Sequence, residues 1–162
     1  MSGKIICSAP FSTDWATEMA IISSPDGENS VSIRQRRRDG TEGRGVSLTL
    51  QELKSLVTAY FEWDEEGGCL RKVSVKRGKD LPKLNILQKI AVFGKTEDEW
   101  NKELNIVSFN ERNPRFDIRE WLPDHTKSRN GKMLSEREME MIAGAYEKHF
   151  GPVHHKKEHW WE

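Results

Sequence analysis

The sequence lacks any long hydrophobic run. No stretch approaches the roughly 18 consecutive apolar residues that a membrane-spanning helix needs, and the opening MSGKIICSAPF lacks the apolar core of a secretory signal peptide. We therefore expect neither a membrane protein nor a secreted one. With 35% hydrophobic and 32% charged residues among 162, the composition indicates a polar globular protein of one domain or two very small ones.

Cysteine is scarce, and net charge is absent. Cys7 and Cys69 have no metal-ligand spacing and do not form an even-numbered framework of four or more, so reduced thiols in a cytoplasm are expected. The 26 basic and 26 acidic side chains cancel. This balance argues against a protein that coats polyanions indiscriminately, but it allows basic residues to gather on one surface.

Motifs for catalysis are also missing. The chain contains no GxxxxGK[ST] phosphate loop, no HExxH and no nuclease-type carboxylate cluster in a strand context. The stretch GKMLS, which begins at Gly131, lacks the upstream glycine of a phosphate loop. His154, His155 and His159 near the C-terminus do not define a metal site. We therefore expect a binding protein rather than an enzyme, with no cofactor and no metal.

What the sequence does contain is an internal repeat. Residues 14–35 align with residues 99–120 at a constant shift of 85, and one extra residue in the following loop moves the shift to 86. The matches include Trp15 with Trp100, Glu18 with Glu103, Ile33 with Ile118, Arg34 with Arg119, Gly45 with Gly131, and Glu52 with Glu138. Apolar parity, turns and helix start recur in one order, which indicates a duplication.

Each repeat predicts four strands followed by a helix. In the third strand Val31 and Ile33 alternate with polar residues, which is typical of a strand with one buried face. Capping boxes at Thr49 (TLQE) and Ser135 (SERE) predict the two helix starts. The expected fold is therefore α+β, with two tandem β-β-β-β-α repeats, each a curved antiparallel sheet with one C-terminal helix. The expected boundaries are 1–63 for the first repeat, 64–83 for a basic linker, 84–150 for the second repeat and 151–162 for a tail.

The motif FDIREWLPDHTKSRNGKMLSEREMEMI (residues 116–142) carries a family resemblance. The second repeat resembles the single-stranded DNA-binding domain of the transcriptional coactivator positive cofactor four, especially its small bacterial and phage versions. The first repeat resembles it more weakly, through VSIRQ, RGVSL and TLQEL. The resemblance implies a dimer whose curved sheets bind separated strands or melted duplex, here fused into an intrachain pseudodimer. It also implies a role in replication, recombination or transcription in a bacterial or infected host cell.

Basic residues cluster where that family presents cations to phosphates. Within eleven residues the first repeat has Arg34, Arg36, Arg37, Arg38 and Arg44. The second repeat offers Lys102, Phe109, Arg112, Arg115, Arg119, Trp121, Lys127, Arg129 and Lys132. A guanidinium can pair with phosphate oxygens through two N–H groups, and an aromatic ring can stack on any base. The combination predicts contact with single-stranded nucleic acid.

The two halves are expected to differ. Trp121 should lie on the same polar strand face as Arg119 and stack on a base, whereas its counterpart in the first repeat is Arg36. The first half would then bind mainly through charge and the second through stacking. Trp15 and Trp100 have two open interpretations, as core residues or as stacking residues.

Several alternatives remain open at this point. The arginine-rich strand end could be a solvated edge that discourages aggregation. The protein could be a protein–protein adaptor whose basic loops meet an acidic partner, or it could bind single-stranded RNA. The basic linker could be a connector or a further phosphate contact, and CLRKVSV within it could form an extra strand. Trp160 and Trp161 in the tail could dock replication or transcription proteins, and the fused chain could associate further.

Overall fold

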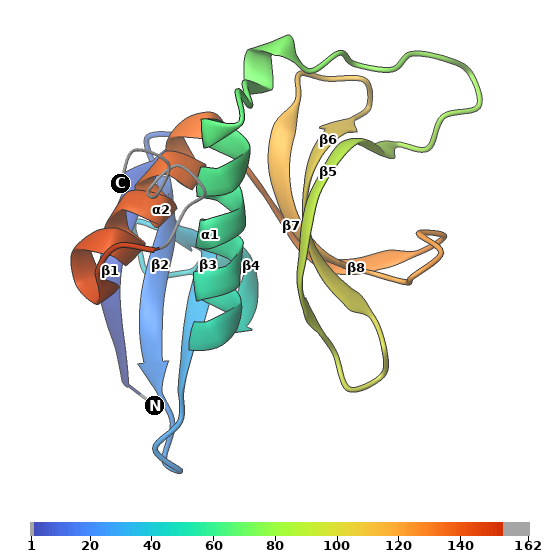
Figure 1. Ribbon diagram of the computed structural model, residues 1–162. Helices are drawn as coiled ribbons and strands as arrows, with labels where there is room; N and C mark the ends of the chain where they lie inside the picture. Colours follow the sequence, from blue (N-terminus) through green and yellow to red (C-terminus); the bar gives the residue numbers. More distant parts are fainter. Residues whose placement is uncertain (1, 154–162) are drawn as a thin grey trace, which may run out of the picture.

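The computed structural model describes residues 2–153, leaving residues 1 and 154–162, with the tail's histidines and tryptophans, outside the described part. It contains two four-stranded antiparallel sheets, each followed by a helix (Figure 1). The first repeat consists of β1 (Ser2–Pro10), β2 (Trp15–Ser23), β3 (Asn29–Arg37), β4 (Glu42–Thr49) and α1 (Leu50–Glu65). The second consists of β5 (Leu84–Lys95), β6 (Asn101–Phe109), β7 (Arg115–Trp121), β8 (Ser128–Leu134) and α2 (Glu136–Phe150).

Strand order follows the sequence in both sheets, which confirms the predicted fold class. The alternation in β3 is also confirmed, since Val31 and Ile33 are fully buried while Arg34 and Arg36 lie on the opposite face. Both predicted capping boxes form. The Thr49 hydroxyl accepts a hydrogen bond from the backbone N–H of Glu52 at 3.0 Å, and the Glu52 carboxylate accepts one from that of Thr49 at 2.9 Å. Such reciprocal bonds satisfy N–H groups that a helix start leaves free.

Each helix packs on both repeats, an arrangement that we call the helix exchange. The helix α1 packs against β5 of the second sheet as well as β3 and β4 of its own, and α2 packs against β1 of the first sheet as well as β7 and β8 of its own. The two helices also touch each other. Figure 1 shows α1 and α2 side by side in front of the first sheet, with the second sheet to the right of α1. Each helix therefore covers apolar surface of the other repeat.

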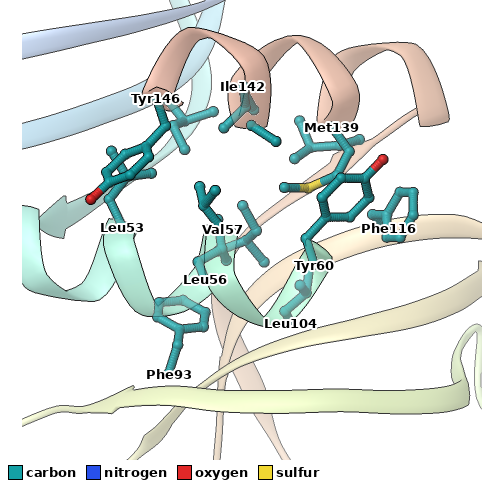
Figure 2. Packing of buried hydrophobic residues seen from close by; sticks show 14 of the residues in the cluster. Leu53, Leu56, Val57, Tyr60, Phe93, Leu104, Phe116, Met139, Ile142 and Tyr146 are labelled. Carbon is teal, nitrogen blue, oxygen red and sulfur yellow. The ribbon is translucent and has the colours of Figure 1, made fainter. Parts of the chain in front are cut away.

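One hydrophobic core results from this exchange (Figure 2). Figure 2 shows residues of α1, such as Leu53 and Val57, facing Met139 and Ile142 of α2. Phe116 of β7 is fully buried, and its ring centroid lies 5.6 Å from that of Tyr60 and 5.3 Å from that of Trp63, both in edge-on contact. The two repeats therefore share one core.

A pair of polar contacts shows that the repeats are related by an approximate two-fold axis. The capping glutamate of α1, Glu52, accepts a hydrogen bond from the ammonium of Lys102 on β6 at 3.0 Å. The capping glutamate of α2, Glu138, accepts one from the hydroxyl of Thr17 on β2. Thr17 and Lys102 are counterparts in the repeat, as are Glu52 and Glu138. Reciprocal contacts of this kind define a two-fold interface, so the predicted pseudodimer is confirmed.

Some local expectations differ from the structure. The helix α1 continues to Glu65, two residues beyond the expected boundary, and Trp15 is the first residue of β2. The linker forms a 3-10 turn, η1 (Leu70–Lys72), and no strand over the segment CLRKVSV, so of the alternatives for this segment the extra strand is not formed. No helix within residues 2–153 is long and apolar enough to cross a bilayer.

The helix exchange predicts the behaviour of an isolated repeat. Residues 84–150 expressed alone should dimerise, because the sheet would lack the helix that covers it and α2 would lack its partner strand. The full chain should sediment as a monomer at the same concentration. Analytical ultracentrifugation measures both. An isolated repeat that stays folded and monomeric at high concentration would contradict the exchanged core.

Candidate nucleic-acid interface

Two matched arginines lie flat on the outer faces of the sheets. The Arg34 Nε donates a hydrogen bond to the hydroxyl of Ser32 at 2.6 Å. The Arg119 guanidinium donates two to the carboxylate of Asp117, at 2.9 and 3.2 Å. Burial raises the pKa of Asp117, although the bonds from Arg119 and its charge act in the opposite direction. Both arginines are thus held by the residue two positions earlier, on the same strand face.

The matched glycines Gly45 and Gly131 make room for these arginines. A Cβ atom on Gly45 would lie 2.1 Å from the Cβ of Arg34, and one on Gly131 would lie 2.1 Å from the Cζ of Arg119. Both distances are far below van der Waals contact. The glycine of the RGV motif therefore allows β4 to approach the backbone and Cβ of Arg34, and the glycine of the NGK motif allows the Arg119 guanidinium to lie against β8.

Six of the twelve candidate cations hold acidic partners at 2.6–3.7 Å. The pairs are Arg34 with Glu42, Arg36 with Glu18 and Glu42, Lys102 with Glu52, Arg115 with Glu138, Arg119 with Asp117, and Arg129 with Glu120 and Asp98. A phosphate would have to compete with these carboxylates. The outer sheet faces are therefore less basic than the sequence suggests.

Lys132 does not lie where the sequence analysis placed it. It is opposite Ile118 in the β7–β8 register, so its side chain points to the helix side, and it is only 5% exposed. Its ammonium donates a hydrogen bond to the carbonyl of Met133 at 3.0 Å. The expectation that Lys132 shares the outer face with Arg119 is wrong. It is buried where β8 meets β4, at the junction of the two repeats.

The expectation of an exposed indole at Trp121 is also wrong. Trp121 does share a strand face with Arg119, because these residues oppose Asn101 and Glu103 of β6. The side chain is nevertheless 6% exposed. The loop after β7 folds over this face, so that the His125 ring lies 5.6 Å from the indole and its Nε2 lies 2.9 Å from both carboxylate oxygens of Glu103. Trp121 is therefore a buried residue of the second sheet.

Five candidate cations are exposed and make no ion pair with any residue in the described part of the chain. They are Arg37, Arg38, Arg44, Arg112 and Lys127. Arg112 follows the 37% exposed Phe109 in the β6–β7 turn, and Lys127 lies in the β7–β8 loop, so these two are at opposite ends of β7. The three arginines of the first repeat lie together around the β3–β4 loop.

Two aromatic rings lie beside these three arginines. The Arg37 guanidinium lies 5.7 Å from the centroid of the half-buried Trp15 ring, and Phe11 in the same loop is 49% exposed. The backbone N–H of Arg38 bonds to the carbonyl of Asp14 at 2.8 Å, which joins the two loops. Phe11 also lines a pocket with Arg44. We refer to Phe11, Trp15, Arg37, Arg38 and Arg44 as the arginine–aromatic end.

Phe11 is not among the site residues predicted from the sequence. Its signal was a large apolar residue directly after Pro10, at the end of a strand pattern and outside any periodic set. Trp100, the counterpart of Trp15, is half-buried beneath Arg129, whose Cζ lies 4.2 Å from its ring centroid. Both matched tryptophans thus support an arginine, and whether either one stacks on a base stays a prediction.

The burial of Trp121 predicts that removing its indole destabilises the fold. Trp121→Ala should lower the free energy of unfolding by about 3–5 kcal/mol, as removal of a large buried aromatic usually does. Phe109→Ala, at an exposed aromatic of the same sheet, should change it by about 0.5 kcal/mol or less. Urea unfolding of both variants tests this, and equal, small losses would show that Trp121 is not a packing residue.

No group of three or more His, Cys, Asp or Glu residues between residues 2 and 153 is arranged to hold a metal ion. Comparison with models of known protein families found none that matches the chain, and comparison with curated proteins found no significantly similar sequence. The resemblance of the second repeat to the domain of positive cofactor four therefore stays a prediction from its motif.

Proposed function

We propose that this protein binds single-stranded DNA, with the arginine–aromatic end of the first sheet as its main contact surface. The observation that carries the proposal is the grouping of three exposed, unpaired arginines with two accessible aromatic rings. Guanidinium groups can pair with phosphate oxygens, and aromatic rings can stack on unpaired bases. A duplex would offer the phosphates but keep its bases stacked on each other.

The distribution of charge supports a localised contact. The chain as a whole is neutral, and the carboxylates on the sheet faces neutralise most of the other candidate cations. Attraction for a polyanion is then concentrated where arginines have no acidic partner. This pattern favours one defined path for the strand over general coating of the protein.

The roles of the two halves are reversed with respect to the sequence analysis. The first repeat combines free cations with accessible rings, whereas the indole of Trp121 in the second is buried. The second repeat would contribute more weakly, through Arg112 and Phe109 in one turn and Lys127 in another loop. The protein would act without catalysis in replication, recombination or transcription, in the cytoplasm of a bacterial or infected host cell.

The salt dependence of binding tests the role of the unpaired arginines. For single strands the slope of log K against log salt is roughly 0.7 per phosphate contact, so replacing Arg37, Arg38 and Arg44 together by Gln should reduce the slope by about 2. Arg36→Gln is the matched control, because Arg36 is already paired with Glu18 at 2.6 Å, and its slope should change little. Tryptophan fluorescence titration with oligo-dT, duplex DNA and single-stranded RNA measures all of these.

The outcomes of this titration separate the candidate functions. Tighter binding of oligo-dT than of duplex or RNA supports the proposal, while equal or tighter binding of RNA would redirect it to an RNA-binding protein. No response to any nucleic acid at low salt would reject the proposal and favour a protein–protein adaptor. An unchanged slope in the triple variant would make the arginines a solvated edge.

The aromatic part of the surface has its own test. Phe11→Ala should weaken oligo-dT binding by roughly ten-fold or more, even in high salt, because base stacking contributes about 1–3 kcal/mol and does not depend on counterion release. Stability should change little, because Phe11 is half-exposed. Phe150→Ala, at another exposed phenylalanine on α2, is the control. Equal affinities of the two variants would exclude Phe11 as a stacking residue.

A further inference from the structure

A small pocket at the junction of the repeats is lined by four basic side chains. Its volume is about 110 Å³, and Arg44 of the first repeat faces Arg115, Arg119 and Lys132 of the second across it. The 49% exposed ring of Phe11 forms one wall. We refer to this as the junction pocket. It exists only because the exchanged helices hold β4 beside β8.

Carboxylates compensate only two of the four cations. Arg115 pairs with Glu138 at 3.2 Å, and Arg119 pairs with Asp117 at 2.9 Å. Arg44 and Lys132 have no carboxylate within 4 Å among the described residues. Four positive charges against two negative ones leave an excess of two positive charges around the junction pocket.

Of the two unpaired cations, Arg44 is exposed to solvent whereas Lys132 is buried. Its ammonium can donate three hydrogen bonds, but the only hydrogen-bond acceptor in the described structure is the Met133 carbonyl at 3.0 Å. The ammonium also lies 5.8 Å from the centroid of the Phe11 ring, a contact that supplies no negative charge. Burial lowers the pKa of Lys132, although the nearby Glu138 opposes the shift. A buried charge without a partner is costly, and proteins usually supply a counter-ion or bind one.

Glu138 does not serve as that counter-ion by direct contact. Its carboxylate already accepts hydrogen bonds from the backbone N–H of Ser135, the hydroxyl of Thr17 and the guanidinium of Arg115. Burial raises the pKa of Glu138, but the bonds from Ser135 and Thr17 and the charge of Lys132 outweigh it and hold the pKa below its usual value. Glu138 therefore stays ionised and committed to the helix cap and the inter-repeat contact.

We propose that the junction pocket binds one phosphate monoester, the phosphate at the end of a single strand. A terminal phosphate carries a charge of about −1.5 to −2 near neutral pH, which matches the local excess, and its free oxygens can meet both Arg44 and a buried ammonium. An internal phosphodiester has one charge, and the chain on both sides would keep it from reaching a side chain that is 5% exposed. Phe11 lies where the terminal base could stack. The strand as the source of the phosphate rests on the proposed function.

The approximate two-fold symmetry provides an internal comparison. A second junction pocket, of about 260 Å³, is lined by Gly45, Val46, Ser47, Glu120 and Asn130. These are the repeat counterparts of Gly131, Lys132, Met133, Gln35 and Arg44. Val46 and Asn130 thus stand in place of the two uncompensated cations. The proposal therefore assigns one phosphate site to each chain and none to the symmetry-related pocket.

The test compares oligo-dT that ends in a 5′- or 3′-phosphate with oligo-dT that ends in hydroxyl groups, using the full chain. One phosphate-bearing end should bind about ten-fold tighter, the scale of a new set of charge-assisted hydrogen bonds. Lys132→Met should abolish that gain and leave hydroxyl-ended binding in place, since methionine fills a similar volume. Arg44→Gln changes an exposed residue and should not affect folding. It should lower the affinities for both phosphate-ended and hydroxyl-ended oligo-dT, and it should also remove the difference between them. Lys127→Met, which removes an exposed lysine elsewhere, should retain the gain.

A second arm uses inorganic phosphate alone, monitored by calorimetry and by the shift in melting temperature that binding to the folded state produces. Binding of one phosphate per chain that is lost in Lys132→Met would support the pocket. If inorganic phosphate binds in this way but no oligonucleotide does, only the DNA strand as the source of the phosphate is rejected. Tight binding of hydroxyl-ended oligo-dT with no gain from a phosphate end and no site for inorganic phosphate would overturn the inference and leave the proposed function standing. A gain that survives both Lys132→Met and Arg44→Gln would also overturn it.

Discussion

The structure depends on the burial of both sheets' apolar faces against two helices that each pack on both repeats. α1 covers β5 and α2 covers β1, and the residues of both helices enter one core with those of both sheets. A four-stranded sheet and one helix make a small unit with little surface to bury. The exchange doubles the core without a second chain, because the linker of residues 66–83 joins the two halves. The junction pocket follows from this shared core.

The helix starts contribute to both folding and assembly. Glu52 and Glu138 close the capping boxes of α1 and α2, and each also accepts a hydrogen bond from a strand of the other repeat. The same carboxylates thus fix where each helix begins and how it docks. At the Glu138 end the docking also brings Arg44 of the first repeat beside the basic side chains that the second repeat contributes to the junction pocket. The geometry of assembly therefore creates a concentration of positive charge that neither repeat has alone.

Features that depend on local pattern could be predicted from the sequence. The repeat, the alternation of Val31 and Ile33, and the capping boxes at Thr49 and Ser135 were sufficient for the order of elements and for the pseudodimer. Strand parity was also right for Trp121, but its burial depends on a loop that folds over the sheet and places His125 against the indole. Such coverage is tertiary, and alternation within one strand carries no information about it.

The errors in the candidate site have the same physical origin. Ion pairs such as Arg36 with Glu18 join different strands, so a count of arginines in one segment overestimates the charge available to a ligand. The position of Lys132 was open to inference, because it lies two residues before the buried Leu134 and so shares its strand face. Phe11 gave only a weak signal in the sequence. Its role at the site depends on neighbours from the other repeat, and no local sequence pattern shows which residues those are.

Fusion of the two repeats also permits the halves to differ, as the two junction pockets show. In a homodimer a buried lysine without a counter-ion would occur twice, and its desolvation would cost free energy at both places. In the fused chain one copy has Lys132 and Arg44, while the other has Val46 and Asn130, which need no anion. The cost of an unpaired buried charge is thus confined to one side of the molecule. Val46, the apolar counterpart of Lys132, is buried without this cost on the other side of the junction. Only the pocket that contains Lys132 therefore carries an unfavourable desolvation free energy, which a bound anion would reduce.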